Sequence, residues 1–228
     1  MHFIFSFLVL SFITVNASAQ VWDVTIDALT PPADFPARIF READFEQYPE
    51  LKEYKIVIVI NKSNTGNTRQ SLRVYDNQKL IMLTKVSTGR ETYEAGCKEG
   101  QDPKIHHCSK RAYWSTTPTG YFDVDSLDEN YFSNLWQTWM PYSVFFEPGI
   151  ATHQAPAGSE SKLSYRASGG CVRMHPTAAP ALFMAVQKAG KGLVPRIKRD
   201  GSIAKNKQGD IIRWQSYRTL VIVQNIQE

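Results

Sequence analysis

The residues best suited to chemistry lie in the segment Ser168-Gly169-Gly170-Cys171-Val172-Arg173-Met174, and His153 stands eighteen positions before the cysteine. A thiol with a pKa near ~8.5 is mostly protonated at neutral pH, so it needs a base or a positive field to react as a thiolate. An imidazole, which titrates near ~6.5, can supply both. The pattern therefore predicts a nucleophilic Cys171 with His153 as its general base.

Two glycines come immediately before Cys171. They allow a sharp backbone turn and leave room for an incoming carbonyl group. They also free the amides of Gly170 and Cys171 to point at a developing oxyanion, where preorganised donors contribute most. A buried structural thiol is the alternative interpretation, but it fits poorly with a Gly-Gly approach and a following Arg173.

The other two cysteines, Cys97 and Cys108, are eleven residues apart in a polar segment. In an oxidising compartment, an odd cysteine count favours one bridge and one thiol left over. We expect a Cys97–Cys108 disulfide that leaves Cys171 free; two reduced thiols are the alternative. His106 and His107 raise the possibility of zinc, but the spacing lacks the separated ligand pairs of structural sites. We therefore expect no metal and no cofactor.

The N-terminus has the pattern of a signal peptide. An apolar run from residue 3 to residue 15 is too short for the ~20 residues that span a bilayer. It is followed by Ala17-Ser18-Ala19, small residues where a signal peptidase cleaves. We expect residues 1–19 to be removed on export to the periplasm or cell envelope, and no transmembrane segment in the mature protein. A buried N-terminal strand or helix is the alternative.

The rest of the chain predicts the elements that must hold this site. β-branched or alternating runs indicate strands over 55–60, 71–75 and 79–89, which form an antiparallel meander. Further strands are expected near 117–124 and 218–223, an elaborated loop over 90–117, and a helix over 177–189 between Pro176 and Gly190. Residues 20–53 are expected to be a lead-in segment with a short helix around 37–47, and 54–228 a single domain. The net charge of +4 suits an anionic polymer, but no Lys/Arg cluster is dense enough for nucleic acid.

The order of these motifs resembles the YkuD-type L,D-transpeptidase family, in which a His precedes a [Ser/Thr]-His-Gly-Cys turn by about fifteen positions. The similarity covers roughly residues 54–190 and includes Ser87-Thr88-Gly89 and the T-P-x-G-x-F element at residues 117–122. It implies a mainly β fold, an L,D-transpeptidase-like β-sandwich with mixed sheets and one main helix after the cysteine turn. It also implies peptidoglycan stem peptides as substrate, and an amine as acyl acceptor, which could be carried by a wall-attached protein.

The resemblance further implies roles for single residues. The carbonyl of Gln154 would orient the His153 imidazole, Arg173 would hold a substrate carboxylate, and Ser168 would shape the turn. One departure is Gly169, where the family usually has a second His; we expect a Gly169→His variant still to be acylated. Another is His153-Gln154-Ala155 in place of His-Gly-Thr, which affects the shape of the acceptor pocket.

Three functions remain open. L,D-transpeptidation is the leading one, in which a Cys171 thioester is transferred to an amine to form 3→3 cross-links, attach a wall protein or exchange a D-amino acid. L,D-carboxypeptidase or endopeptidase activity would transfer the same acyl group to water. A non-catalytic wall-binding domain is the third, but the intact Cys–His pair argues against it.

Overall fold

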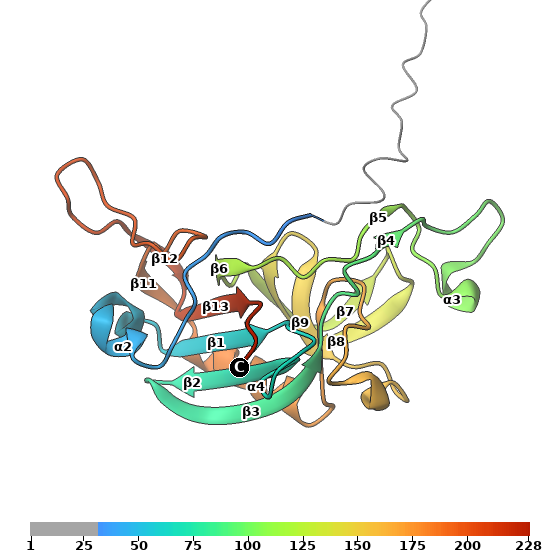
Figure 1. The fold of residues 1–228 in the computed structure, drawn as a ribbon, viewed down its shortest axis with the longest axis horizontal. Helices are drawn as coiled ribbons and strands as arrows, with labels where there is room; N and C mark the ends of the chain where they lie inside the picture. The colour runs from blue at the N-terminus through green and yellow to red at the C-terminus, as the bar shows by residue number, and fades with distance from the viewer. Residues whose placement is uncertain (1–31) are drawn as a thin grey trace, which may run out of the picture.

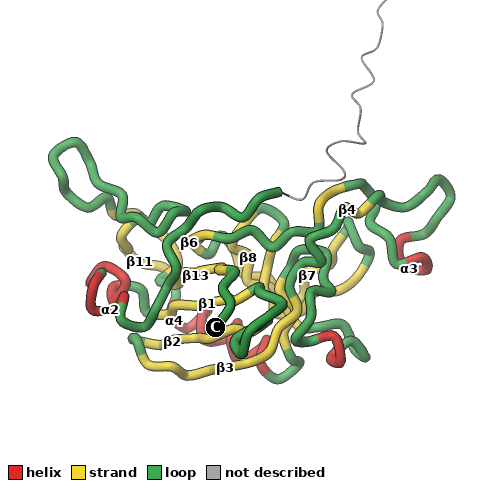
Figure 2. Tube along the Cα trace, viewed as in Figure 1, coloured by secondary structure: helices red, strands yellow, loops and turns green. Residues whose placement is uncertain are grey.

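The computed structural model describes residues 32–228, so the expected signal peptide at 1–19 and the start of the lead-in lie outside the described residues. The helical elements are α2 (Asp44–Gln47), the 3-10 helix η1 (Pro49–Glu53), α3 (Pro103–His106), the 3-10 helix η2 (Glu160–Lys162) and α4 (Ala178–Ala189). The strands are β1 (Ile56–Asn61), β2 (Ser71–Asp76), β3 (Lys79–Ser87), β4 (Tyr93–Glu94), β5 (Tyr113–Trp114), β6 (Gly120–Asp123), β7 (Ser126–Ser133), β8 (Thr138–Glu147), β9 (Ile150–Gln154), β10 (Val172–Met174), β11 (Lys191–Pro195), β12 (Arg213–Tyr217) and β13 (Thr219–Gln224). Strands make up most of the regular structure (Figure 2).

Nine strands form one mixed sheet in the order β6-β13-β1-β2-β3-β10-β9-β8-β7. The pairs β1–β13 and β10–β9 are parallel and the other pairs are antiparallel. The expected meander of β1, β2 and β3 is confirmed. Two short hairpins, β11–β12 and β4–β5, lie outside the sheet (Figure 1).

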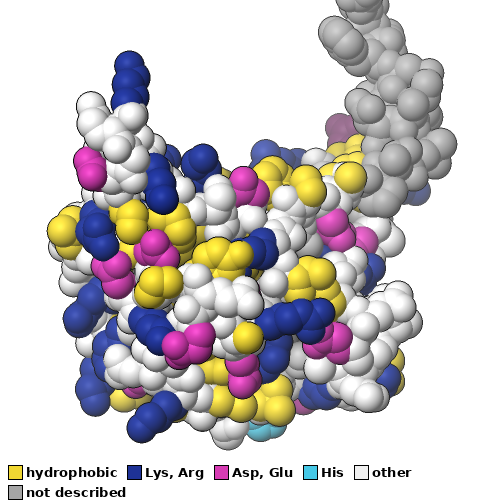
Figure 3. Space-filling model, turned by 60° about the vertical axis from the view of Figure 1, so that its left-hand side comes forward, with side chains coloured by type: hydrophobic (Ala, Val, Ile, Leu, Met, Phe, Trp, Pro, Cys, Tyr) yellow, Lys and Arg dark blue, Asp and Glu magenta, His cyan; other side chains and the backbone are white. Residues whose placement is uncertain are grey.

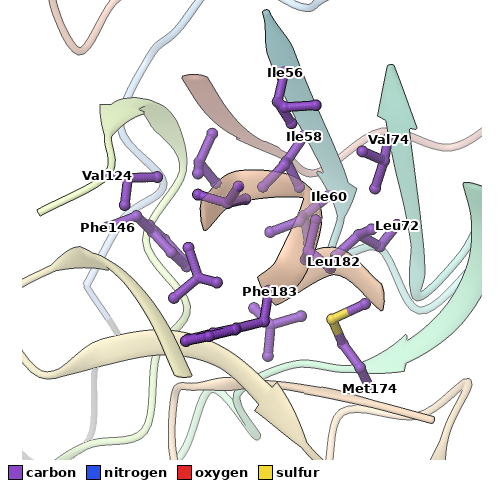
Figure 4. Packing of buried hydrophobic residues seen from close by; sticks show 14 of the residues in the cluster. Ile56, Ile58, Ile60, Leu72, Val74, Val124, Phe146, Met174, Leu182 and Phe183 are labelled. Atoms are coloured by element: carbon purple, nitrogen blue, oxygen red, sulfur yellow. The ribbon is translucent and has the colours of Figure 1, made fainter. Parts of the chain in front are cut away.

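The sheet curls, and its two ends share one core with α4. Buried side chains from β1 and β2 meet those from β8 and β10 in a single apolar cluster. Leu182 and Phe183 of α4 lie among Ile58, Leu72 and Phe146 (Figure 4). The expected fold class is therefore confirmed: mainly β, with mixed pairing and one main helix after the cysteine turn.

Strand β1 is buried along its whole length because both faces of the sheet are covered there. Its alternate side chains point into two clusters: Ile58 joins the core under α4, and Val57 joins a second cluster on the other face. That second cluster takes Phe40, Phe45 and Leu51 from the lead-in segment. The lead-in is thus a packed cover of the sheet; of the helix expected around 37–47, only α2 at its end is present, and the 3-10 helix η1 follows it.

Helix α4 follows the predicted boundaries within one residue. Its buried residues recur at helical spacing, with Ala179, Leu182, Phe183, Val186 and Ala189 on one side. Gly190 ends it with φ of 65°, a conformation that favours glycine, and donates its amide to the Val186 carbonyl at 3.1 Å. Because α4 packs on the apolar core, it anchors the end of β10, the strand that precedes it in the chain.

Charge is distributed over the surface. On the face shown in Figure 3, Lys and Arg side chains are interspersed with Asp and Glu. In residues 32–228, no helix is long and apolar enough to cross a membrane.

Candidate active site

Two adjacent parallel strands bring the segments of the predicted thiol and imidazole side by side. Strand β10 begins directly after Cys171, and its Arg173 pairs in register with His153 of β9. Residues paired in register point the same way, and so do residues two apart on a strand. Arg173 and His153 therefore project from the same face, and Cys171 immediately precedes β10, with its thiol near enough to Arg173 for that charge to act on its pKa.

His153 is a buried imidazole with only 4% of its surface exposed. Its Nδ1 lies 2.7 Å from the Gln154 carbonyl oxygen, as the resemblance implied. A carbonyl only accepts, so Nδ1 carries the proton and Nε2 presents its lone pair. Burial, and secondarily the charge of Arg173, lowers the pKa of His153 to about 4. The imidazole is thus a neutral base at neutral pH.

Cys171 is the free cysteine and is partly exposed. Burial raises the pKa of its thiol, while a backbone hydrogen bond at Ala151 and the charge of Arg173 oppose that rise. Its Sγ contacts the Gly149 carbonyl oxygen at 3.5 Å, and within residues 32–228 it makes no hydrogen bond to His153. Desolvation of both groups by the surrounding protein favours a neutral thiol and a neutral imidazole in the resting state.

The structure corrects one of the two predicted oxyanion donors. The Gly170 amide donates to the Ser168 hydroxyl oxygen at 3.1 Å, so it is already committed. The same hydroxyl donates to the Cys171 carbonyl. Ser168 is buried and shapes the turn, as expected. Of the predicted pair, the Cys171 amide remains the candidate donor.

Gly169 is enclosed by two aromatic residues that the sequence analysis missed. The Tyr113 hydroxyl donates to the Gly169 carbonyl and accepts from the Trp136 indole, both at 2.8 Å. A Cβ on Gly169 would lie 2.6 Å from the Tyr113 hydroxyl and 2.8 Å from the Trp136 ring. The structure argues against our expectation for Gly169→His, because rigid aromatic groups fill the space. The Gly-Gly pair was the only sequence signal of this crowding.

A second arginine, Arg90, lies beside Arg173. Both donate to the Ala167 carbonyl, at 3.2 Å from Arg90 and 3.1 Å from Arg173. Arg90 also pairs with Glu94 at 2.6 Å. Burial, and then the charge of Arg90, lowers the pKa of Arg173. Arg173 places a positive charge near the thiol, and Arg90, which is balanced by Glu94, lies behind it; the charge of Arg173 suits an anionic substrate.

The segment 90–117, expected as an elaborated loop, forms an arm at one wall of the site. It contains the β4–β5 pair and α3, and a disulfide joins Cys97 to Cys108 with an S–S distance of 2.00 Å. The bridge removes both thiols as zinc ligands. The arm also carries Tyr113, which connects it to the cysteine turn.

A thiol on a glycine turn, with an oriented neutral imidazole on the neighbouring strand, is the arrangement of thiol-dependent acyl-transfer enzymes. The model of the YkuD family, the L,D-transpeptidase catalytic domain, matches residues 55–212. The chain belongs to this family, because the match covers more than half of its 228 residues.

The comparison with solved structures finds L,D-transpeptidases from other organisms. One from Xylanimonas cellulosilytica is 19% identical over 74% of this chain and 60% of that chain, with a TM-score of 0.44. One from Mycobacterium smegmatis is 14% identical over 75% of this chain and 58% of that chain, also with a TM-score of 0.44. This chain thus covers less than two thirds of those two proteins. No curated protein matches it in sequence.

Proposed function

We propose that this protein is an exported L,D-transpeptidase that acts on peptidoglycan stem peptides through a thioester on Cys171. The observation that carries the proposal is the in-register pair of Arg173 and His153 directly beside the Cys171 turn, with the imidazole fixed in one tautomer by the Gln154 carbonyl. Family membership supplies the substrate class, because the matched domain is an L,D-transpeptidase catalytic domain.

In the first half-reaction, the Cys171 sulfur attacks the carbonyl of the L-centre at the third stem position. Nε2 of His153 takes the thiol proton as the C–S bond forms, and the Cys171 amide faces the tetrahedral oxyanion. The C–N bond then breaks, and the imidazolium returns the proton to the departing D-residue amine. A neutral thiol and imidazole at rest suit this order of steps, since the proton moves from Cys171 to His153 only when substrate is in place.

In the second half-reaction, an amine attacks the thioester and the thiol is regenerated. A side-chain amine of another stem gives a 3→3 cross-link, and an amine on a wall-attached protein would give anchoring. Water as acceptor gives a trimmed stem instead, which is the L,D-carboxypeptidase alternative. The positive charge of Arg173 near the thiol favours donors that carry a free carboxylate.

Export is supported by two independent features. The leader-like residues 1–19 end in small side chains, and the Cys97–Cys108 disulfide is typical of an oxidising compartment such as the periplasm. We propose that the mature chain works in the cell envelope.

The test is incubation of the mature protein, from Gln20 onward, with purified sacculi, followed by muropeptide analysis. New 3→3 dimers are expected, and a Cys171→Ala variant should produce none. Tripeptides without dimers would replace transpeptidation by hydrolysis. No change in muropeptides, together with no mass gain from a carbapenem, would overturn the catalytic proposal.

A further inference from the structure

The peptide group that joins Gly170 to Cys171 is held by a residue from a distant part of the chain. Thr117 Oγ1 donates to the Gly170 carbonyl oxygen at 2.6 Å, across a separation of 53 residues. Thr117 is fully buried, so water does not compete for this bond. It is the first residue of the T-P-x-G-x-F element, which runs into β6.

The direction of this hydrogen bond is fixed by a second one. The Gly89 amide donates to Thr117 Oγ1 at 2.8 Å. A hydroxyl has a single proton, and the oxygen that accepts from Gly89 therefore directs its own proton at Gly170. Only a glycine can bring the backbone of position 89 this close to the segment that carries Thr117, because a Cβ there would lie 2.1 Å from the Ser115 carbonyl oxygen.

Holding the Gly170 carbonyl also sets the direction of the Cys171 amide. A trans peptide is planar, and its N–H points opposite to its C=O. Three other polar groups of the turn are committed: the Gly169 carbonyl to Tyr113, and the Gly170 amide and Cys171 carbonyl to Ser168. Within residues 32–228, no hydrogen bond outside the regular helices and sheets uses the Cys171 amide.

We propose that Thr117 is a positioning residue that aims the Cys171 amide at the oxyanion of the acyl-transfer step. This inference rests on the proposed function, because it requires acylation of Cys171. Donor alignment matters most where charge develops in the transition state. The hydroxyl should therefore affect the rate of acylation more than the binding of the acyl donor, and a mainly structural hydroxyl would affect only stability.

The experiment compares Thr117→Val, which removes the hydroxyl at nearly constant shape, with Thr117→Ser, which keeps it. A third variant, Thr119→Val, is the matched control: Thr119 is also buried, and its hydroxyl donates to the Phe35 carbonyl oxygen at 3.0 Å, away from the turn. A carbapenem is the acyl donor, and mass spectrometry follows the limiting acylation rate and the half-saturating concentration. Iodoacetamide provides a second reaction, because alkylation of the thiol displaces iodide without forming an oxyanion.

We expect Thr117→Val to lower the limiting acylation rate by about 10- to 100-fold, with the half-saturating concentration nearly unchanged. This loss is smaller than the ~10²–10³-fold loss of rate that follows removal of an oxyanion donor itself. Its alkylation rate should stay close to wild type, Thr117→Ser should recover most of the acylation rate, and Thr119→Val should acylate like wild type.

Two results would overturn the inference: wild-type acylation by folded Thr117→Val, or equal losses in Thr117→Val and Thr119→Val. If Thr117→Val does not fold, Thr117→Ala is the second hydroxyl-free variant, and failure of both to fold would assign the hydroxyl a structural role only. A wild-type protein that is alkylated but never acylated would instead refute the proposed function.

Discussion

His153 is a base that the fold keeps neutral by burying it. Its lowered pKa, about 4, means that protonating it in the folded state is costly, since the charge would be desolvated and would face Arg173. In the unfolded chain the same imidazole titrates near ~6.5. Folding and protonation of His153 are therefore linked.

This linkage predicts that His153 makes the protein less stable in acid. Between pH 6.5 and 4 the unfolded state binds the proton more tightly, so stability falls as the pH falls, by at most about 3 kcal/mol. His153→Gln should lack this loss. Urea unfolding of both proteins at pH 7, 6, 5 and 4.5 measures the difference. Burial raises the pKa of Asp123 to about 6, so this carboxyl changes the stability in the opposite direction over the same pH range. The change is the same in both proteins and cancels when their stability profiles are compared. Parallel stability profiles would contradict the buried-base assignment.

A second residue-scale prediction concerns Gly169. A side chain there meets the Tyr113 hydroxyl and the Trp136 ring at less than 3 Å. Overpacking against rigid groups costs about 1–3 kcal/mol, so Gly169→His should lower the melting temperature and slow acylation by a carbapenem. Ala157→His is the control, because Ala157 is exposed and its backbone already carries a Cβ. An unchanged melting temperature for Gly169→His would show that the aromatic pair moves aside.

Cys171 and His153 could be found from the sequence because their chemistry depends on residue type and local spacing. Thr117 and Tyr113 could not, since they act on the turn across 53 and 56 residues. A threonine or tyrosine in those positions has many ordinary uses, and only the register of the sheet brings its hydroxyl to a particular carbonyl. The commitment of the Gly170 amide to Ser168 is local, two residues apart, but it depends on the conformation of the turn, which residue types alone do not specify.

At the scale of elements, strands with strong local patterns were predicted, whereas the long strands β7 and β8 and the short strands of the site were not. The meander β1–β3, helix α4 and strand β13 lie close to their expected positions. Strands β9 and β10, which carry the site, have only five and three residues and no clear alternation. Their parallel pairing joins segments separated by the η2 loop, and such contacts leave little trace in local sequence.

The arm over 90–117 gives a prediction at this scale. Its hairpin pairs two residues with two, so the Cys97–Cys108 bridge is its main constraint. A Cys97→Ser/Cys108→Ser double variant should be cleaved faster by protease within 98–107, and its free energy of unfolding should fall by up to about 3 kcal/mol. Acylation should also slow, because Tyr113 is held less firmly. Cys171→Ser keeps the bridge and is the control for protease cleavage and unfolding, and the wild-type protein is the reference for acylation. Equal protease resistance would mean that packing alone holds the arm.

At the scale of the whole molecule, the two ends of the chain complete the sheet and its cover. The family match ends at residue 212, yet β13 lies between β6 and β1, and all six of its residues are buried. The lead-in covers the opposite face from the α4 core through Phe40, Phe45 and Leu51. The matched region alone therefore lacks both an inner strand and one side of its apolar packing.

A chain that ends at Tyr217 should consequently fail to fold. It loses Leu220, Val221, Ile222 and Val223, each at most 1% exposed. At about 2 kcal/mol for each buried side chain, the loss is about 8 kcal/mol, comparable to the ~5–15 kcal/mol that stabilises a typical domain. Circular dichroism on heating should show no cooperative transition. Removing only Gln227 and Glu228, which are exposed, should leave a cooperative transition. If the chain ending at Tyr217 still melts cooperatively, then β6 pairs directly with β1 and the parallel closure is dispensable.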